Sequence, residues 1–217
     1  MIKVKKIKIA DKEFNFPKTY NDLTLGQYIE VAKLDRDRAN YMVKGNETFG
    51  EYLFALKMIE VLCNIKPNDL DDVEIKEFSK FTEAIHELLS NTKLKSITTF
   101  KYLDHDYYFK SFDNLTNNEY ISYETKRVES ESNLDILPEL LAIICRPGKI
   151  TLNKLNKKVT ELDRFDATEL VDRAEAFKTL PAYYFIDAAN FFLNRKNTTV
   201  KNSNNYTSQK KEKINTQ

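Results

Sequence analysis

The first residues of the chain alternate between apolar and polar side chains in the manner of a short β-hairpin. A polar stretch at residues 10–13 separates two apolar groups. This period of about two residues predicts two strands joined by a turn. Pro17 closes the second strand, because its ring nitrogen cannot donate a hydrogen bond to a sheet. The apolar positions are Val4, Ile7, Ile9, Phe14 and Phe16.

The residues after this hairpin carry a complete helix-start signal. Thr24 is placed as an N-cap, and Gln27, three residues later, completes a capping box. Leu23 and Tyr28 stand at the two positions that form a hydrophobic staple. We therefore predict that a helix begins at about Leu25.

The same order of signals recurs 92 residues later. Aromatic positions flank the polar stretch 104–106 as a second hairpin, and Thr116 with Glu119 repeats the capping box. Leu115 and Tyr120 repeat the staple. Because helices in unrelated proteins also need a starting signal, capping alone explains part of this match, and the alternative to duplication stays open. The flanking aromatic residues are Phe100, Tyr102, Tyr107 and Phe109.

Each half then continues with an apolar helical pattern that ends in a cysteine and is followed closely by a proline, which cannot continue a helix. A helical pattern led by acidic residues comes next. The two cysteines stand 82 residues apart rather than 92, which counts against a strict repeat. The apolar patterns span 49–63 and 137–145, the prolines are Pro67 and Pro147, and the acidic patterns span 70–89 and 162–178.

The predicted fold class is therefore α+β, mainly α, with two tandem hairpin-plus-helices units that an internal duplication would explain. We expect the first unit in residues 1–96 and the second, similar unit in residues 97–194. Apolar residues at helical spacing over 174–192 predict a helix that breaks or kinks at Pro181 and resumes as an aromatic-rich closing helix. Residues 195–217 hold almost nothing to bury, so we expect a basic disordered tail.

The composition fits a globular, helix-rich protein. The 217 residues are 41% hydrophobic and 31% charged, and a chain of this length can bury a sizeable core. The presence of only 4 Gly and 5 Pro favours helices over a β-sandwich, which needs more turn residues. The start lacks the apolar stretch of a signal peptide, and no window reaches the roughly 18 apolar residues of a membrane span. We therefore expect synthesis in the cytoplasm and no membrane partner.

The charge is unevenly distributed, although the net charge is only +1. From Arg195 onward six basic residues stand against one acidic residue, whereas residues 1–194 carry 28 basic and 32 acidic residues. A solubilising tail is the simplest interpretation. Docking of the tail onto nucleic acid or onto an acidic protein surface is the alternative, because lysine and arginine neutralise phosphates without a fixed structure.

The two histidines offer little for catalysis or metal binding. His86 stands in a helical run, where a surface or interfacial position is expected. His105 lies between Asp104 and Asp106 in the second predicted hairpin. Adjacent residues in a turn rarely converge on one ion, and zinc sites usually draw ligands from separated positions. We therefore predict no metal site.

Other catalytic signatures are also missing from the sequence. Cys63 and Cys145 stand in apolar runs, where a cysteine usually behaves as a small buried hydrophobe in a reducing compartment; a disulfide or redox pair is the alternative. The scattered glycines form neither a phosphate loop nor a dinucleotide fingerprint, and no G-x-S-x-G elbow occurs. Acidic pairs at 71–72 and within 129–131 have the spacing of solvated faces. We predict that the protein is not an enzyme and has no catalytic, cofactor-binding or metal-binding residues.

Four segments carry a family resemblance: the opening hairpin, the start Leu23-Thr24-x-x-Gln27-Tyr28-Ile29, the run Leu137-Pro138-Glu139-Leu140-Leu141-Ala142-Ile143-Ile144, and Arg173-Ala174-Glu175-Ala176-Phe177-Lys178-Thr179-Leu180-Pro181 leading into Phe191-Phe192-Leu193. Together they resemble small structural proteins of tailed bacteriophages that infect gut Bacteroidetes, the crAss-like group included. The resemblance covers residues 5–193 loosely.

The resemblance implies a virion structural protein: a neck, ring or tail-adaptor component, present in several copies around the tail axis and bound to other phage structural proteins. The alternative within the same group is a soluble tail assembly chaperone. Neither function brings catalytic residues with it. The edge strands and aromatic residues of the hairpin at residues 7–16, and the helices beside it, lead us to expect homo-oligomeric contacts there.

Overall fold

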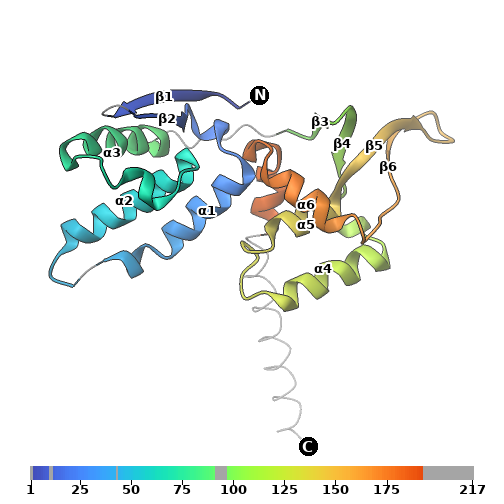
Figure 1. Ribbon diagram of the computed structural model, residues 1–217. Helices are drawn as coiled ribbons and strands as arrows, with labels where there is room; N and C mark the ends of the chain where they lie inside the picture. Colours follow the sequence, from blue (N-terminus) through green and yellow to red (C-terminus); the bar gives the residue numbers. More distant parts are fainter. Residues whose placement is uncertain (1, 10–11, 43, 91–96, 193–217) are drawn as a thin grey trace, which may run out of the picture.

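The computed structural model describes residues 2–9, 12–42, 44–90 and 97–192. Within these residues the chain forms two lobes, each with a small antiparallel sheet and its own helices (Figure 1). Helical residues outnumber strand residues, so the predicted α+β, mainly α class is confirmed. The predicted basic tail, residues 195–217, lies outside the described residues.

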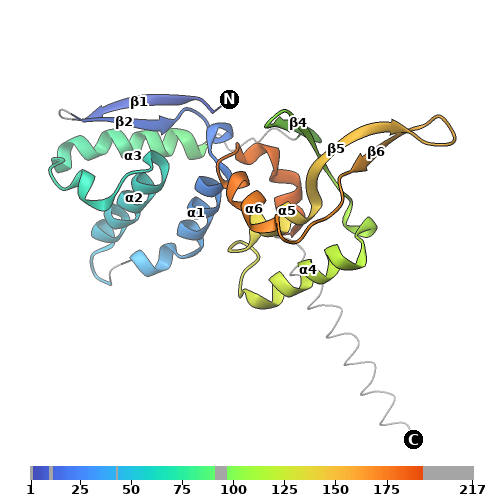
Figure 2. The ribbon, with the colours of Figure 1, turned by 45° about the vertical axis from the view of Figure 1, so that its right-hand side comes forward.

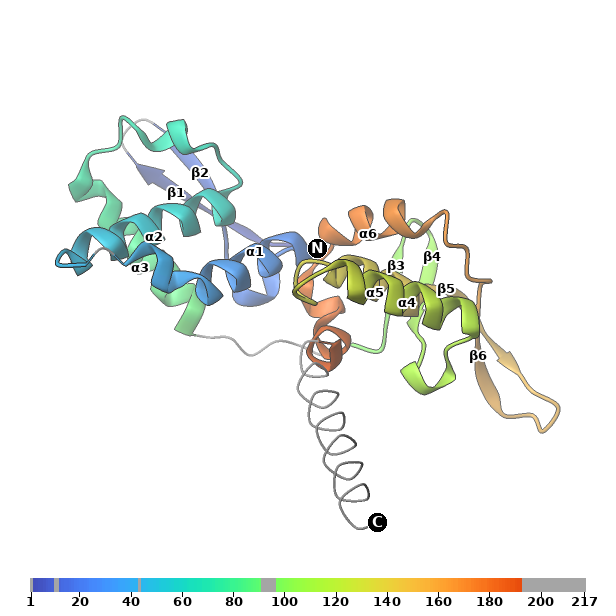
Figure 3. The same ribbon diagram turned by 90° about the horizontal axis from the view of Figure 1, so that it is seen from below.

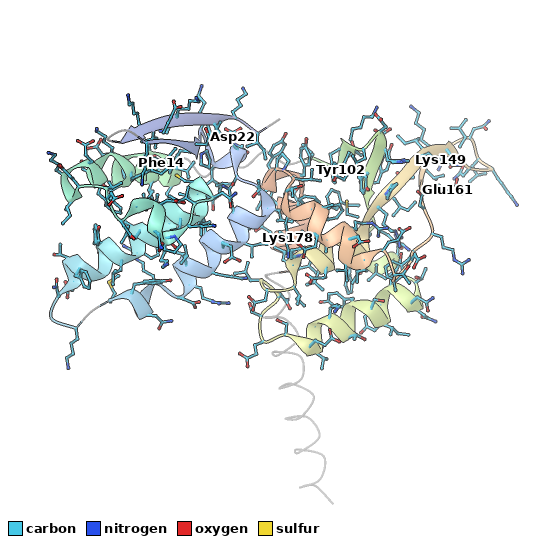
Figure 4. The ribbon with its side chains drawn as sticks, viewed as in Figure 1. Phe14, Asp22, Tyr102, Lys149, Glu161 and Lys178 are labelled. Carbon is cyan, nitrogen blue, oxygen red and sulfur yellow. The ribbon has the colours of Figure 1, made fainter. Side chains whose placement is uncertain are left out.

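The first lobe consists of a hairpin and three helices, and the hairpin packs on the second and third of these helices. Its strands pair antiparallel with Ile7 opposite Phe14, and the alternating pattern buries Phe14 and Phe16 on the helix side. The Phe14 side chain points from the second strand toward the third helix, and its ring centre lies 5.3 Å from that of Phe81 (Figure 4). The elements are β1 (Val4–Ile9), β2 (Lys12–Pro17), η1 (Tyr20–Asp22), α1 (Leu25–Arg36), η2 (Arg38–Tyr41), α2 (Glu47–Cys63), η3 (Pro67–Leu70) and α3 (Ile75–Ser90).

Helix periodicity explains how α2 and α3 complete this core. The buried side chains of α3 recur three and four residues apart, which places them on one face of the helix. Helix α2 ends at Cys63, as predicted, because Asn64 adopts the left-handed conformation with φ of 52°. The acidic pattern expected over 70–89 becomes η3 and then α3, so the helix begins later than predicted. The buried α3 residues are Phe78, Phe81, Ala84, Ile85 and Leu88.

The second lobe combines a four-stranded antiparallel sheet with three helices and a closing segment. The strand order is β3-β4-β5-β6. Helix α5 is buried almost all round, and it packs between α4 and α6. The elements are β3 (Thr99–Tyr102), β4 (His105–Phe109), η4 (Phe112–Asn114), α4 (Asn117–Glu129), α5 (Leu137–Ile144), β5 (Cys145–Leu152), β6 (Lys158–Leu162), α6 (Leu170–Lys178) and η5 (Ala182–Tyr184).

Both predicted capping boxes are present. Thr24 Oγ1 accepts from the Gln27 amide at 3.0 Å, and the Gln27 side chain accepts from the Thr24 amide at 3.0 Å. Thr116 and Glu119 repeat both bonds at 3.5 and 2.6 Å. A 3-10 turn precedes each capped helix at matched positions, η1 in the first lobe and η4 in the second. The recurrence therefore extends from sequence signals to local structure.

The second lobe departs from the predicted order in one element. The β5–β6 hairpin, residues 145–162, is an additional element that precedes the acidic helix; that helix was expected over 162–178 and begins only at Leu170, as α6. Cys145 opens β5 instead of ending the helix, and Pro147 lies within β5 opposite Tyr107. The physical reason is the free edge of β4, which offers backbone hydrogen bonds to the residues after Ile144.

Helix α1 joins the two lobes because its side chains enter both cores. Leu25 and Ile29 belong to the core of the second lobe, whereas Val31 belongs to that of the first. The Leu25 amide donates to the Leu180 carbonyl at 2.8 Å, and the Ala182 amide donates to the Leu23 carbonyl at 2.8 Å. The lobes are therefore tied by backbone bonds as well as by a shared helix.

The closing segment follows the predicted break. Helix α6 ends at Lys178, Pro181 and η5 interrupt the helical path, and residues 186–192 are helical again. Its rings pack into the second core, where Phe185 and Phe192 are fully buried. The predicted boundary after residue 96 falls beside residues 91–96, which lie outside the described part of the chain.

Candidate interaction surface

Strands β5 and β6 extend beyond the sheet as a two-stranded arm. Strand β4 pairs only with the first residues of β5, from Cys145 to Pro147. From Gly148 opposite Leu162 onward, β5 and β6 pair only with each other. We call residues 148–162 the β5–β6 arm. It projects away from the helices of the second lobe (Figure 2).

The β5–β6 arm combines exposed aliphatic side chains with lysines. Ile150 and Leu152 lie on one face of β5 and are 57% and 64% exposed, and Leu155 in the loop is 74% exposed. No acidic residue occurs between residues 149 and 160. Apolar side chains that gather on one exposed element, rather than being scattered singly, indicate a candidate contact surface. The lysines are Lys149, Lys154, Lys157 and Lys158.

The tip of the β5–β6 arm is held in one conformation by Asn153. Its side-chain oxygen accepts from the amides of Leu155 at 2.9 Å and Lys157 at 3.0 Å. Its backbone amide donates to the Lys157 carbonyl at 2.9 Å. Asn156 takes the left-handed conformation with φ of 55°, which asparagine tolerates well. The loop therefore presents Leu155 from a hydrogen-bonded frame.

The two strands approach closely at the base of the arm. A Cβ added to Gly148 would lie 2.6 Å from the Glu161 carbonyl oxygen, a distance at which the strands would have to separate. Lys149 and Glu161 face each other across the same strands, with Nζ and Oε2 4.0 Å apart (Figure 4). Glycine at 148 is thus required by the close approach of β6.

A buried charge cluster fixes the base of the arm to α4. Glu119, at the third position of α4, is 1% exposed, and Arg146 of β5 is 2% exposed. Arg146 donates through Nη2 to Glu119 Oε1, and Lys110 donates to Glu119 Oε2 at 2.7 Å. Thr116 adds its amide at 2.6 Å and its hydroxyl at 2.9 Å. One carboxylate therefore links the α4 N-terminus, the end of β4 and the base of the arm.

These bonds decide the protonation of Glu119. Burial by itself raises the pKa of a carboxyl, but the donors from Lys110, Thr116 and Arg146 outweigh it and lower the pKa of Glu119 from 4.5 to about 2. The carboxylate therefore stays charged at neutral pH, as its role toward two cations requires.

A pocket of about 740 Å³ opens over this cluster, between the α4 N-terminus and the chain that follows β6. Three basic side chains and two acidic ones line it. Nε and Nη1 of Arg146 are buried with no hydrogen-bond partner among the described residues, and the guanidinium lies 5.4 Å from the ring centre of Phe165. The lining contains no histidine or cysteine. Chemically, the pocket suits an anionic or carbonyl group. The charged lining residues are Lys110, Glu119, Arg146, Asp163 and Arg164.

The residues singled out in the sequence are scattered. His86 is exposed on α3, and His105 is exposed at the start of β4. Asp104 has a fully exposed side chain and lies 3.8 Å from Lys101. Within the described residues, no group of three or more His, Cys, Asp and Glu side chains is placed to hold a metal ion.

The two cysteines are buried free thiols, in agreement with their apolar surroundings in the sequence. They lie in different cores, Cys63 in that of the first lobe and Cys145 in that of the second. Burial raises the pKa of Cys63 to about 12 and raises that of Cys145 as well. Neither thiol is poised for nucleophilic chemistry.

The sequence interpretation placed the expected contacts at the hairpin of residues 7–16 and did not identify the β5–β6 arm or the Glu119 cluster. That hairpin turns Phe14 and Phe16 inward, and whether it forms contacts stays a prediction. Two signals for the arm were present in the sequence: Ile150 alternates with Leu152, and asparagines at 153 and 156 mark a turn. Arg146 offered no comparable signal, because its partners come from other elements.

Comparisons with family models, with curated proteins and with solved structures each returned no match. Among the described residues, the structure contains no helix with the length and hydropathy needed to cross a membrane.

Proposed function

We propose that the chain is a virion structural protein of a tailed phage, a neck, ring or tail-adaptor component that works through protein–protein contacts. The family resemblance of residues 5–193 supports the phage assignment. The β5–β6 arm supports the mode of action, because it exposes Ile150, Leu152 and Leu155 away from the lobe that carries it. A projecting strand pair with free edges is suited to pairing with a neighbouring protein.

The arm is the single observation that carries the contact function. Its tip is ordered by Asn153, and its base is fixed by Gly148 and by the Glu119 cluster. A contact element that is ordered before it binds loses less conformational entropy on binding. The structure thus supplies a preorganised element whose apolar side chains have no partner within the lobe's core clusters.

The phage assignment is tested by quantitative mass spectrometry of purified intact particles of the phage that encodes this chain. A structural component is present at a fixed copy number per particle. A tail assembly chaperone, the alternative function, is found in the lysate but not in mature particles. Absence from the particles, with fully assembled tails, would remove the proposal.

The role of the arm is tested with a shortened variant. Replacing residues 151–159 by Asn-Gly leaves Ile150 opposite Thr160 as the last strand pair and closes it with a two-residue turn. We expect this variant to fold with an unchanged far-UV circular dichroism spectrum, but to fail to enter particles when it replaces the natural chain. Normal incorporation would show that the arm is dispensable for contact.

A further inference from the structure

The first lobe carries an acidic counterpart to the arm. Residues 68–77, here called the acidic end, contain five acidic residues against one lysine. They span η3 and the first turn of α3. Ile75 lies among them and is 77% exposed, so the acidic end, like the arm, combines charge with an exposed aliphatic side chain. The acidic residues are Asp69, Asp71, Asp72, Glu74 and Glu77.

Part of this charge has a local role and part does not. Glu74 pairs with Lys76 at 2.5 Å, and Glu77 pairs with Lys80. Acidic residues at this position also favour the N-terminus of α3. Asp71 and Asp72, however, are exposed and form no ion pair within the described part of the chain.

The arm likewise carries charged side chains without a local ion-pair partner in the part of the chain that the structure describes, and these charges are positive. Of its four lysines only Lys149 has an acidic side chain within ion-pair distance among the described residues, at 4.0 Å from Glu161. Lys154, Lys157 and Lys158, toward the tip, have none there. Both surfaces therefore keep several charges available to another molecule.

The two surfaces lie at opposite extremes of the molecule. The start of α3 is at the far end of the first lobe, and the β5–β6 arm extends from the far end of the second (Figure 1). The view from below shows the same separation (Figure 3). One chain cannot bring its own arm onto its own acidic end.

We infer that the β5–β6 arm of one copy docks on the acidic end of a second copy, with Lys154, Lys157 and Lys158 facing Asp71, Asp72 and Glu74. Leu155 and Ile75 supply apolar contact at the centre of this charged surface. The inference rests on the proposed contact function and names the surfaces that pair. Because the two surfaces differ, the contact is heterologous and repeats from copy to copy, closing into a ring or continuing as a filament.

The exposed aliphatic residues favour a protein partner over nucleic acid for the arm. Phosphate recognition relies on basic and hydrogen-bonding side chains and does not require Ile150, Leu152 or Leu155 at the surface. Charge complementarity with the acidic end of the same chain supplies the specific partner, and opposite charges at the rim also guide encounter.

The contact is tested by neutralising each surface separately. Lys154→Gln/Lys157→Gln/Lys158→Gln and Asp71→Asn/Asp72→Asn/Glu74→Gln each alter only exposed side chains, so both variants should keep the melting temperature of the natural chain. By sedimentation velocity at low ionic strength and high protein concentration, we expect the natural chain to self-associate in a salt-sensitive way. Each variant should associate at least about tenfold more weakly.

Mixing the two variants gives the decisive result. The lysine variant keeps an intact acidic end, and the acidic-end variant keeps an intact arm, so the mixture can form one contact and no more. We expect a complex of two chains, one of each variant, that does not grow further. A carbodiimide cross-link between Lys154, Lys157 or Lys158 of an isotopically labelled acidic-end variant and Asp71 or Asp72 of an unlabelled lysine variant should confirm the pairing by mass spectrometry.

Lys3→Gln/Lys18→Gln/Lys44→Gln is the matched control, because it removes the same charge from exposed lysines that lie outside the arm and outside the hairpin of residues 7–16. Equal loss of association in this control, no two-chain species in the mixture, or a strictly monomeric natural chain would each overturn the inference. Loss of duplex DNA binding by the lysine variant, together with a monomeric natural chain, would assign the arm to nucleic acid instead. Particle mass spectrometry tests the phage assignment independently of all these outcomes.

Discussion

Replacing Glu119 by glutamine removes the charge at the centre of the buried cluster while keeping the size of the side chain. The carboxylate receives bonds from Lys110 at 2.7 Å, from the Thr116 amide at 2.6 Å, from the Thr116 hydroxyl at 2.9 Å, and from Arg146. Glutamine still accepts one or two of these bonds, but Arg146 is left as a buried cation without a counter-charge.

The expected loss follows from the lowered pKa of Glu119. A carboxyl whose pKa is 4.5 in the unfolded chain and about 2 in the folded protein stabilises the fold at neutral pH by about 3 kcal/mol, since each pKa unit corresponds to about 1.4 kcal/mol. This agrees with the ~3–5 kcal/mol expected when one partner of a buried ion pair is removed. We therefore expect Glu119→Gln to lower the free energy of unfolding by about 3 kcal/mol.

Urea unfolding at pH 7, followed by far-UV circular dichroism and by tyrosine fluorescence, measures this loss, because the chain has no tryptophan. The matched control is Glu124→Gln on the same helix, where the partner Arg127 and the glutamate are both about a third exposed. That variant should change the stability by less than about 0.5 kcal/mol. A loss below about 1 kcal/mol for Glu119→Gln would contradict the proposed role of the carboxylate in the fold.

Four further results are expected. Because the folded pKa of Glu119 lies below its ordinary value, its stabilisation is present above about pH 4.5 and is lost as the pH falls toward 2; the natural chain should lose about 3 kcal/mol more than Glu119→Gln over this range in urea titrations at each pH, and parallel curves would count against it. Gly148→Ala should lower the stability by about 1–3 kcal/mol, since the new Cβ would meet the Glu161 carbonyl at 2.6 Å, and an unchanged urea midpoint would show that β6 does not approach so closely. Phe177→Ala should lower the stability by about 3–5 kcal/mol because Phe177 is fully buried, whereas Val128→Ala, at a side chain 78% exposed, should have almost no effect. Iodoacetamide should modify Cys63 and Cys145 at least about a hundredfold more slowly in the native protein than in urea, because burial both covers the thiols and raises their pKa; equal rates measured by mass spectrometry would refute the burial.

The local elements were readable from the sequence wherever a short-range rule decides the structure. The boxes at Thr24 and Thr116 fixed two helix starts, and both are present with the expected bonds. The break at Pro181 was likewise readable, because a proline within a helical pattern acts on its immediate neighbours.

The predictions of secondary structure were wrong where a distant strand offered hydrogen bonds to a segment whose local pattern favours a helix. The apolar run that ends at Cys145 has the pattern of a helix. In the structure Cys145, Arg146 and Pro147 pair with the edge of β4 instead. The acidic pattern after residue 162 is compatible with a helix throughout, but its first residues complete β6 and the connection to α6. The periodicity of apolar residues cannot decide between helix and strand here, because the hydrogen bonds that favour the strand come from residues far away in the chain.

The candidate contact surface depends even more on tertiary structure. Lysines at 149, 154, 157 and 158 are visible in the sequence, and so are the acidic residues of 68–77. Their placement at opposite ends of the molecule is set by how the lobes join through α1 (Figure 1). The two histidines, by contrast, drew attention in the sequence and lie apart on the surface.

The sequence by itself determined the class of the fold, the two capped helices and the hairpin that precedes each of them, 92 residues apart. Each of these follows from interactions between residues close together in the chain. The tertiary structure alone decided the β5–β6 arm, the carboxylate of Glu119 between Lys110 and Arg146, and the sharing of α1 by both cores. These arise from contacts between elements distant in sequence, whose free energies depend on a geometry that no short segment contains.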